Sequence, residues 1–183
     1  MAKATLRLFF ALWPDPETQA AIADLAQFVA TQSKGRAVAA DNVHLTLAFL
    51  GAQPATGLAA LRTLAAAICI RPFELALDEI GCFRRAGIAW LGTSIAPPEI
   101  VGLHADLARN LADAGITLDA RPFSPHLTLA RRVAVPVRRK LAQPIRWKIS
   151  SFVLVASELD QDRPRYRLLD TWNAEGGTAA GGD

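Results

Sequence analysis

Two short segments of the chain carry nearly the same residues, and both have side chains suited to proton transfer. Val43-His44-Leu45-Thr46-Leu47-Ala48 and Pro125-His126-Leu127-Thr128-Leu129-Ala130 share the string His-Leu-Thr-Leu-Ala and hold two of the chain's three histidines. Both copies alternate in the manner of a β-strand. Because residues i and i+2 of a strand point to the same face, each copy presents an imidazole and a hydroxyl side by side.

Two such pairs facing one cleft would form a set suited to phosphodiester cleavage. An imidazole titrates near neutral pH, so one histidine of His44 and His126 can accept a proton while the other donates one. The hydroxyls of Thr46 and Thr128 would donate hydrogen bonds to a substrate oxygen or hold the imidazoles in place. Cleavage needs a base for the nucleophile, an acid for the leaving oxygen and donors for the phosphoryl oxygens. It requires no metal where the protein supplies those donors.

Other chemistries have less support in the sequence. A single histidine on a strand is more often structural, but the repetition of His44 and His126 within one pentamer favours a functional role. A metal site is an alternative, although no third ligand recurs beside them and a catalytic site usually needs three. The chain lacks the nucleophile elbow of serine hydrolases, the P-loop and the dinucleotide fingerprint. The third histidine, His104, falls in an expected helix without a partner motif, and we interpret it as an exposed or capping residue.

Composition and charge restrict the class of protein. The chain has 183 residues and a net charge of +3. Its length fits one domain, or two small lobes that share an interface, and its 51% of hydrophobic residues allow a sizeable core. Basic residues are concentrated between Arg121 and Lys148, a span without Asp or Glu that includes His126. A segment of one charge attracts anions, which favours a phosphate-bearing substrate; a solvated basic face is the alternative.

Cysteine usage and the N-terminus indicate where the protein acts. Cys69 and Cys82 are too few for a disulfide framework or a zinc knuckle and predict reduced thiols. The N-terminus lacks a signal-peptide pattern, and no apolar run is long enough to span a bilayer. We expect a cytoplasmic, monomeric protein that does not interact with membranes.

The elements expected around the two motifs are strands and helices in alternation. Strands are predicted over 5–13, 43–50 (closed by Gly51), 73–82, 88–95, 126–133, 148–159 and 165–172. Helices are predicted from the Asp15 cap to 34–35, over 54–70, over 97–114 and, as a short segment, over 137–143. This order predicts an α+β fold with two similar lobes of antiparallel sheet plus helices, related by a pseudo-two-fold around a central cleft. We expect one such domain over 1–173 and a disordered tail over 174–183.

The wider strings around the motifs resemble a known family. The paired His-x-Thr-x motifs look like those of the 2H phosphoesterase superfamily. Arg7-Leu8-Phe9-Phe10-Ala11-Leu12, the string 42–51 and the string 121–131 resemble the bacterial and archaeal RNA 2′,3′-cyclic phosphodiesterases, once described as 2′-5′ RNA ligases. The closing strings 157–159 and 166–172 also match, so the likeness covers most of the chain.

The resemblance implies a bilobal fold with both motifs lining a central basic cleft. It implies hydrolysis of a 2′,3′-cyclic phosphate at an RNA 3′ end to leave a 2′-phosphate, without a cofactor. By the same resemblance, His44 is the proton donor to the departing 3′ oxygen and His126 the proton acceptor from water. Thr46 and Thr128 would hold the phosphoryl oxygens.

Two further residues are candidates for substrate contact. Arg131 matches the arginine that closes the second motif of the family, whereas Phe49 takes that place in the first copy. Strict alternation puts Arg131 on the face opposite His126, so a contact with phosphate requires a twist, a bulge or a side chain that folds back. Phe9 shares a strand face with Arg7 and could stack on a base, although packing in the core is the favoured interpretation.

Two other functions remain compatible with the motifs. A non-catalytic module that binds nucleotides or RNA would keep the fold, but the intact hydroxyls of both motifs argue against it. Joining of RNA ends through a 2′-5′ bond is the reverse of the same chemistry, and the abundance of water favours hydrolysis.

Overall fold

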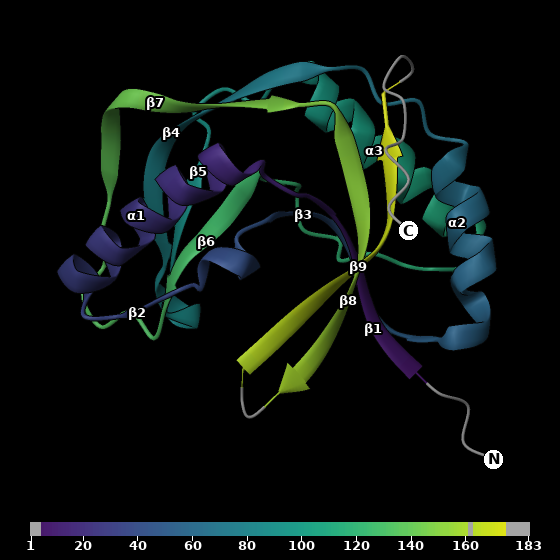
Figure 1. Cartoon of the computed structure of the whole chain (residues 1–183), viewed down its shortest axis with the longest axis horizontal. Helices are drawn as coiled ribbons and strands as arrows, with labels where there is room; N and C mark the ends of the chain where they lie inside the picture. The colour runs from purple at the N-terminus through teal and green to yellow at the C-terminus, as the bar shows by residue number, and fades with distance from the viewer. Residues whose placement is uncertain (1–4, 161–162, 175–183) are drawn as a thin grey trace.

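A single twisted antiparallel sheet organises the chain. The computed structural model describes residues 5–160 and 163–174, and within them three α-helices accompany nine strands (Figure 1). The strands are β1 (Thr5–Leu12), β2 (Arg36–Ala37), β3 (Leu45–Pro54), β4 (Phe73–Phe83), β5 (Ile88–Gly92), β6 (His126–Arg131), β7 (Arg139–Ile149), β8 (Ser151–Asp160) and β9 (Arg163–Asn173). The helices are α1 (Pro16–Ser33), α2 (Leu58–Ala66) and α3 (Pro98–Asp113). The predicted α+β class is confirmed. In this part of the chain, no helix is long and apolar enough to cross a membrane.

The sheet has two halves that meet at the two His-x-Thr strands. Its strand order is β7-β4-β5-β6-β3-β1-β8-β9, with the short β2 beside β6. β3 and β6 are therefore central neighbours, and Leu45 pairs with Leu127 across them. The row of strands on one side of this pair mirrors the row on the other, which is the arrangement that the repeated motif predicts. Figure 1 shows the β8–β9 hairpin projecting away from the half formed by β4 to β7.

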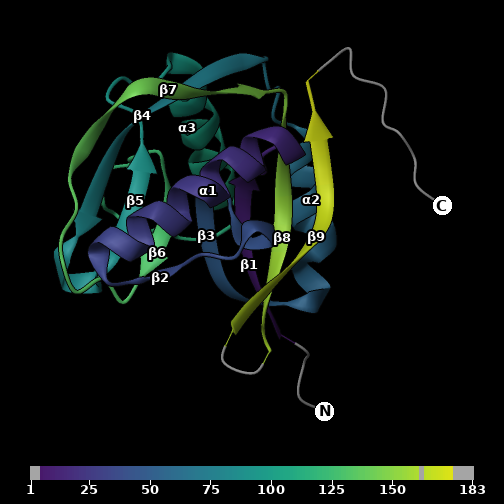
Figure 2. The same cartoon turned by 60° about the vertical axis from the view of Figure 1, so that its left-hand side comes forward.

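Two of the helices cross to the opposite half of the sheet. α1 follows β1 in the chain but packs on β6, β5 and β7, whereas α3 follows β5 and packs on β3 (Figure 2). Leu45 and Leu127 are fully buried in the core formed with these helices. Because side chains alternate along a strand, the histidine and threonine of each motif point to the other face of the sheet.

The sequence at both ends of α1 determines where β2 lies. Asp15 caps the helix, and its carboxylate accepts hydrogen bonds from the backbone N–H groups of Glu17 and Thr18. Lys34 ends it in the left-handed conformation with φ 50°. A Cβ on Gly35 would lie 3.0 Å from the backbone oxygen of Arg131, so the glycine allows the chain to run directly beside β6.

Two predictions about the last third of the chain are wrong. The segment 137–143, expected as a short helix, enters β7, because Arg139 and Lys140 pair in register with Ile80 and Glu79 of β4. The predicted strand over 148–159 is two strands that belong to opposite halves of the sheet. Ile149 pairs with Phe73 of β4, whereas Ser151 pairs with Asn173 of β9.

Other boundaries also differ from the sequence-based expectations. β3 does not end at Gly51 but continues to Pro54, because Gly51 adopts φ 68° at a bulge opposite Leu8. The expected tail includes Ala174, yet Ala174 is buried and its N–H donates to the backbone oxygen of Ser150 at 2.7 Å. Residues 175–183, the rest of that tail, lie outside the described residues.

Candidate active site

The two histidines are brought together by the central strand pair. Leu45 and Leu127 are in direct register, so the antiparallel pairing places His44 opposite Thr128. The same relation holds for Thr46 and His126. All four polar side chains are only partly buried, in contrast to the fully buried leucines. Among the described residues, neither threonine hydroxyl has a hydrogen-bond partner, so both are free to bind a substrate oxygen.

Both imidazoles are oriented by a backbone carbonyl two residues earlier. Nδ1 of His44 lies 2.7 Å from the carbonyl oxygen of Asn42, and Nδ1 of His126 lies 2.7 Å from that of Ser124. A carbonyl oxygen only accepts, so Nδ1 carries the proton and donates in both rings. This leaves Nε2 of each ring as the atom that accepts or donates a proton toward a ligand.

A β-bulge after each threonine explains how Arg131 reaches the same face as His126. The register of β5 and β6 shifts so that Leu129 has no opposite residue on β5. In the same way, Leu47 of β3 has no opposite residue on β1. One extra residue reverses the alternation, which moves Arg131 and Phe49 to the side of the histidines. On that side of the sheet, the charge of Arg131 lowers the pKa of His44.

The first half of the sheet has a different cation. Phe49 occupies the place that Arg131 takes in the second half, and the guanidinium of Arg7 lies 4.8 Å from the centre of its ring. Arg7, Ser157 and Tyr166 are in register across β1, β8 and β9, so Arg7 shares the face of Tyr166. The two halves therefore hold their arginines in different positions around the histidines.

Three aromatic side chains surround His44. Trp13 stacks on the imidazole with ring centres 5.6 Å apart, Phe9 lies at 4.9 Å, and Tyr166 contacts it edge-on at 5.0 Å. Phe9 is only 3% exposed, which fits the core-packing interpretation rather than a direct stack on a base. No role for Trp13 or Tyr166 was predictable from the sequence, because they approach His44 from the end of β1 and from β9.

This environment favours the neutral form of His44. The pKa of His44 is lowered to about 4: burial among the aromatic rings is the main cause and the charges of Arg131 and His126 add to it, while the hydrogen bond to Asn42 acts in the opposite direction. At neutral pH the ring is uncharged and its Nε2 carries a lone pair. Burial also raises the pKa of Tyr166, so its hydroxyl remains a hydrogen-bond donor.

His126 has a more open setting. Phe83 contacts its ring edge-on at 5.1 Å, and Trp90 lies at 6.3 Å. Phe83 is 41% exposed, in contrast to the buried Phe9 beside His44. Trp90 packs over Gly81, where a Cβ would lie 2.1 Å from the indole. Because Gly81 has no side chain, Trp90 can pack at this place. Trp90 in turn helps to position the ring of His126.

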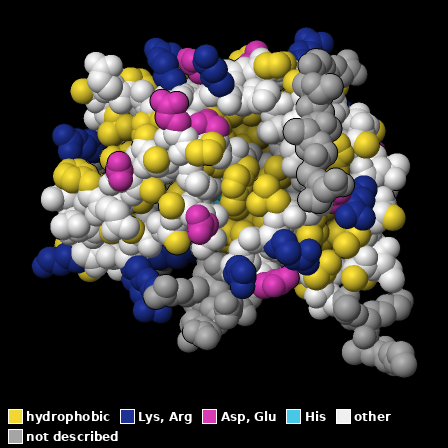
Figure 3. All heavy atoms as spheres, viewed as in Figure 1, with side chains coloured by type: hydrophobic (Ala, Val, Ile, Leu, Met, Phe, Trp, Pro, Cys, Tyr) yellow, Lys and Arg dark blue, Asp and Glu magenta, His cyan; other side chains and the backbone are white. Residues whose placement is uncertain are grey.

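The basic segment of the sequence does not form a continuous basic surface. Arg138, Lys140 and Arg146 of the β7 region pair with Glu79, Asp78 and Glu74 of β4. Arg121 pairs with Asp119, two positions earlier in the chain. Figure 3 shows dark blue and magenta side chains close together along the upper edge, where Figure 1 draws β4 and β7. The alternative of a solvated face therefore fits these four residues, whereas Arg131 and Arg132 form no ion pair with a described carboxylate.

His104 is not the exposed or capping residue that we expected. Its Nδ1 lies 2.9 Å from the backbone oxygen of Leu47, and its ring stacks on Phe123 with centres 4.0 Å apart. It therefore joins α3 to β3 and to the segment before β6. The helical spacing of its neighbours predicted α3 but gave no information about the contact with Leu47, which is distant in sequence.

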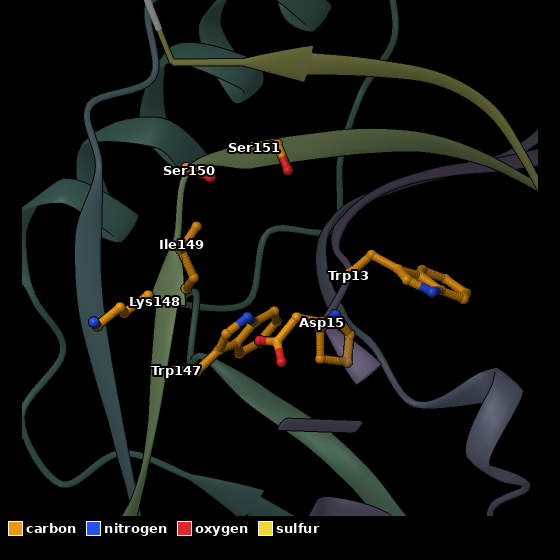
Figure 4. A pocket seen from close by; sticks show the side chains of 8 residues that line it. Trp13, Asp15, Trp147, Lys148, Ile149, Ser150 and Ser151 are labelled. Atoms are coloured by element: carbon orange, nitrogen blue, oxygen red, sulfur yellow. The ribbon is translucent and has the colours of Figure 1, made fainter. Parts of the chain in front are cut away.

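Metal ligands and cavities do not point to another chemistry. Within the described ranges, no group of three or more His, Cys, Asp or Glu side chains is arranged to hold a metal ion. A pocket of about 230 Å³ lies at the junction of β7 and β8 (Figure 4). Its lining consists of Trp13, Pro14, Asp15, Trp147, Lys148, Ile149, Ser150 and Ser151. It contains neither His44 nor His126, and Figure 4 shows the Trp13 side chain extending away from Lys148.

Known proteins are similar to this chain in both sequence and fold. The family model described as the 2′-5′ RNA ligase superfamily matches residues 14–161. The RNA 2′,3′-cyclic phosphodiesterase of Escherichia coli is 37% identical over 169 residues, which cover 91% of this chain and 95% of that protein. The enzyme of the same name from Thermus thermophilus is 29% identical over 181 residues, covering 93% and 91%.

Solved structures agree with these relatives. E. coli LigT complexed with 3′-AMP superposes with a TM-score of 0.86 at 35% identity, covering 94% of this chain and 99% of that one. TT0787 of T. thermophilus superposes with a TM-score of 0.81 at 26% identity, covering 94% and 100%. The resemblance identified from the motifs is confirmed: the chain belongs to the 2′-5′ RNA ligase superfamily.

Proposed function

We propose that this protein hydrolyses 2′,3′-cyclic phosphates at RNA 3′ ends to 2′-phosphates, with His44 and His126 as the acid–base pair. The observation that carries the proposal is the common orientation of the two rings. Each Nδ1 donates to a backbone carbonyl at 2.7 Å, which leaves each Nε2 free on the face that also carries Thr46 and Thr128. The relatives from E. coli and T. thermophilus bear the name of this activity.

The proposed reaction exchanges one P–O bond for another. One imidazole removes a proton from water, whose oxygen attacks phosphorus. The P–O3′ bond breaks and the other imidazole gives its proton to O3′, so the product carries a 2′-phosphate and a free 3′ hydroxyl. The threonine hydroxyls and Arg131 stabilise the charge on the phosphoryl oxygens. One proton passes from water to the base and another from the acid to O3′, and side chains of the protein supply the hydrogen-bond donors, so the proposed mechanism uses no metal or cofactor.

The family resemblance assigns the donor role to His44, and this role depends on the substrate. His44 is neutral in the free protein because its pKa is about 4. An anionic phosphate beside the ring stabilises the imidazolium and raises that pKa, so the donor acquires its proton as the substrate binds. The reverse assignment, with neutral His44 as the base, is the alternative that must be tested.

The principal test uses an RNA oligonucleotide that ends in a 2′,3′-cyclic phosphate, in excess EDTA. We expect the wild-type protein to remain active, and His44→Ala and His126→Ala each to lose roughly 10²- to 10⁴-fold in kcat. Arg109→Gln serves as the control, because Arg109 is exposed on α3 and pairs with Asp106. Full activity in either active-site variant contradicts the two-histidine mechanism, and loss of wild-type activity in EDTA indicates a metal.

A modified leaving group separates the two roles. Sulfur in place of O3′ leaves as a thiolate without protonation, so it restores turnover to the variant that lacks the acid. With His44 as the donor, this substrate rescues His44→Ala but not His126→Ala. The opposite pattern of rescue reverses the assignment.

The remaining expectations have direct tests. A non-catalytic module would bind a nucleotide 2′-phosphate without turnover of any cyclic phosphate, and a 2′-5′ bond in the products would indicate joining of ends. We propose a single domain over residues 1–173, a monomer and a cytoplasmic location. Limited proteolysis, size-exclusion chromatography and cell fractionation test these three proposals.

A further inference from the structure

We propose that arginines beside the active site bind the phosphates of the RNA strand upstream of the reacting end. We name them the arginine edge: Arg36, Arg84, Arg85 and Arg132, which lie beside Arg131 of the active site. The consequence is a preference for oligonucleotides over cyclic mononucleotides. This inference rests on the proposed function, since it identifies the class of RNA that the same site accepts.

Arg36 is the residue that extends the site beyond Arg131. In the antiparallel pairing of β2 and β6, Arg36 lies directly opposite Arg131. Residues in direct register share a face of the sheet, and Arg131 is on the face of the histidines, so Arg36 is on that face too. Like charges in direct register destabilise a sheet, and a bound anion between them removes this cost.

The other members come from the turn beside the end of β6. Arg84 and Arg85 lie in the 3₁₀ turn between β4 and β5, and Gly87 after this turn accepts a hydrogen bond from Val133 at 3.0 Å. Arg132 adjoins Arg131 and adopts φ 55°, a left-handed conformation that is unusual for a side chain of this size. The end of β6 and the turn therefore place their arginines at one end of the sheet.

In the described part of the chain, the arginine edge has no acidic partners, unlike three basic residues of the neighbouring β7 region. Among the residues whose side chains the structure describes, no carboxylate forms an ion pair with any of its arginines. Arg138, Lys140 and Arg146 of the β7 region, in contrast, pair with Glu79, Asp78 and Glu74. Dark blue side chains are visible at the lower left of Figure 3, below the region where Figure 1 draws β2. A surface with unmatched arginines favours a polyanion.

An exposed aromatic ring makes single-stranded RNA the expected polyanion. Phe83 is 41% exposed, contacts the ring of His126 at 5.1 Å and precedes Arg84 in the chain. It therefore connects the reacting position to the arginine edge and presents a face on which a base can stack. Proteins that bind single-stranded nucleic acids combine such rings with cationic side chains along the backbone.

The test compares a 2′,3′-cyclic mononucleotide with a short RNA oligonucleotide that ends in a 2′,3′-cyclic phosphate. We expect Arg36→Gln to raise the KM of the oligonucleotide about tenfold more than that of the mononucleotide, because a charge-assisted contact to an upstream phosphate is lost. The slope of log kcat/KM for the oligonucleotide against log salt should become shallower by about 0.7, the value for one contact to a single strand. Phe83→Leu should also raise the KM of the oligonucleotide more than that of the mononucleotide.

Arg109→Gln is the matched control, because Arg109 is exposed on α3 and pairs with Asp106. It should change the KM of neither substrate. Equal effects of Arg36→Gln on both substrates, or no effect, overturn the inference while the proposed function stands. If the wild-type protein hydrolyses neither substrate, the proposed function fails. Fluorescence anisotropy with an oligonucleotide that ends in a 2′-phosphate then decides the inference, since Arg36→Gln must weaken binding and Arg109→Gln must not.

Discussion

Leu45 and Leu127 pair directly across β3 and β6, and this contact places the two His-x-Thr motifs in one site. Both leucines are fully buried in the core with the helices, so their neighbours in the chain point to the opposite face. The pair thus relates the two copies of the motif by an approximate two-fold axis. The functional asymmetry comes from side chains outside the repeat: an aromatic enclosure around His44, and Phe83 and Trp90 around His126.

Replacement of Arg131 should change both substrate binding and the titration of His44. Arg131→Gln removes a cation from the phosphate, and we expect the KM of a cyclic-phosphate substrate to rise about tenfold. The same cation lowers the pKa of His44, so that pKa should rise in the variant. Steady-state kinetics and NMR titration of the imidazole measure the two effects. An unchanged KM contradicts the phosphate contact, and Arg109→Gln should leave both quantities as in the wild type.

His44 should make the protein less stable in mild acid. Its pKa is about 4 in the folded protein and about 6.5 when unfolded, so the unfolded chain binds more protons between these values. Above pH 6.5, the protonation of His44 should therefore not change the free energy of unfolding. It should fall as the pH decreases from 6.5 toward 4, by at most about 3 kcal/mol.

Urea denaturation at several pH values tests this dependence. His44→Gln cannot titrate, so the loss of stability between pH 6.5 and 5 should be smaller in the variant. Carboxylates contribute equally to both proteins and cancel in the comparison. Parallel curves for the two proteins would show that His44 titrates normally in the folded state.

The aromatic enclosure has its own test in the pKa of His44. Trp13 stacks on the imidazole, so Trp13→Ala exposes the ring to water. Because burial is the main cause of the lowered pKa, we expect the value to rise from about 4 toward 6.5. NMR titration of His44 provides the measurement. Phe83→Leu alters the contact with His126 and should leave the pKa of His44 unchanged. If Trp13→Ala does not change the pKa of His44, Phe9 and Tyr166 are the residues that bury the ring.

The parts of the structure that follow from local sequence were predictable. The alternation in 43–50 and 126–133 predicted both motif strands, although β6 ends at Arg131, and the Asp15 cap predicted the start of α1. The bulges at Leu47 and Leu129 were not predictable, because they depend on pairing with β1 and β5. The twist or bulge that Arg131 requires was nevertheless stated from its spacing to His126.

Features that depend on distant segments could not be derived from one sequence. The span from Arg121 to Lys148 contains no acidic residue, but β4 supplies Glu74, Asp78 and Glu79 beside it. Register with the same strand overrides the helical interpretation of 137–143. Trp13 and Tyr166 reach His44 only after the sheet has formed. In each case a cross-strand neighbour, and not local propensity, decides the role of the residue.

Gly81 should be intolerant of even one methyl group. A Cβ at this position would lie 2.1 Å from the indole of Trp90, which must then move. Trp90 lies 6.3 Å from the ring of His126 and 5.6 Å from that of Phe83, so its displacement disturbs both. We expect Gly81→Ala to lower the free energy of unfolding by about 1–3 kcal/mol and to lower kcat. Thermal denaturation and steady-state kinetics measure the two quantities.

The double variant Gly81→Ala, Trp90→Phe separates a steric cause from a loss of backbone freedom. Phenylalanine lacks the part of the indole that the new methyl group meets, so we expect the second substitution to recover part of the stability. Gly102→Ala is the control, because nothing lies within 4 Å of a Cβ there. Gly102 is inside α3, where alanine should stabilise the protein by about 0.5–1 kcal/mol. If Gly81→Ala is as stable as the wild type, the close packing of Trp90 on Gly81 does not position His126.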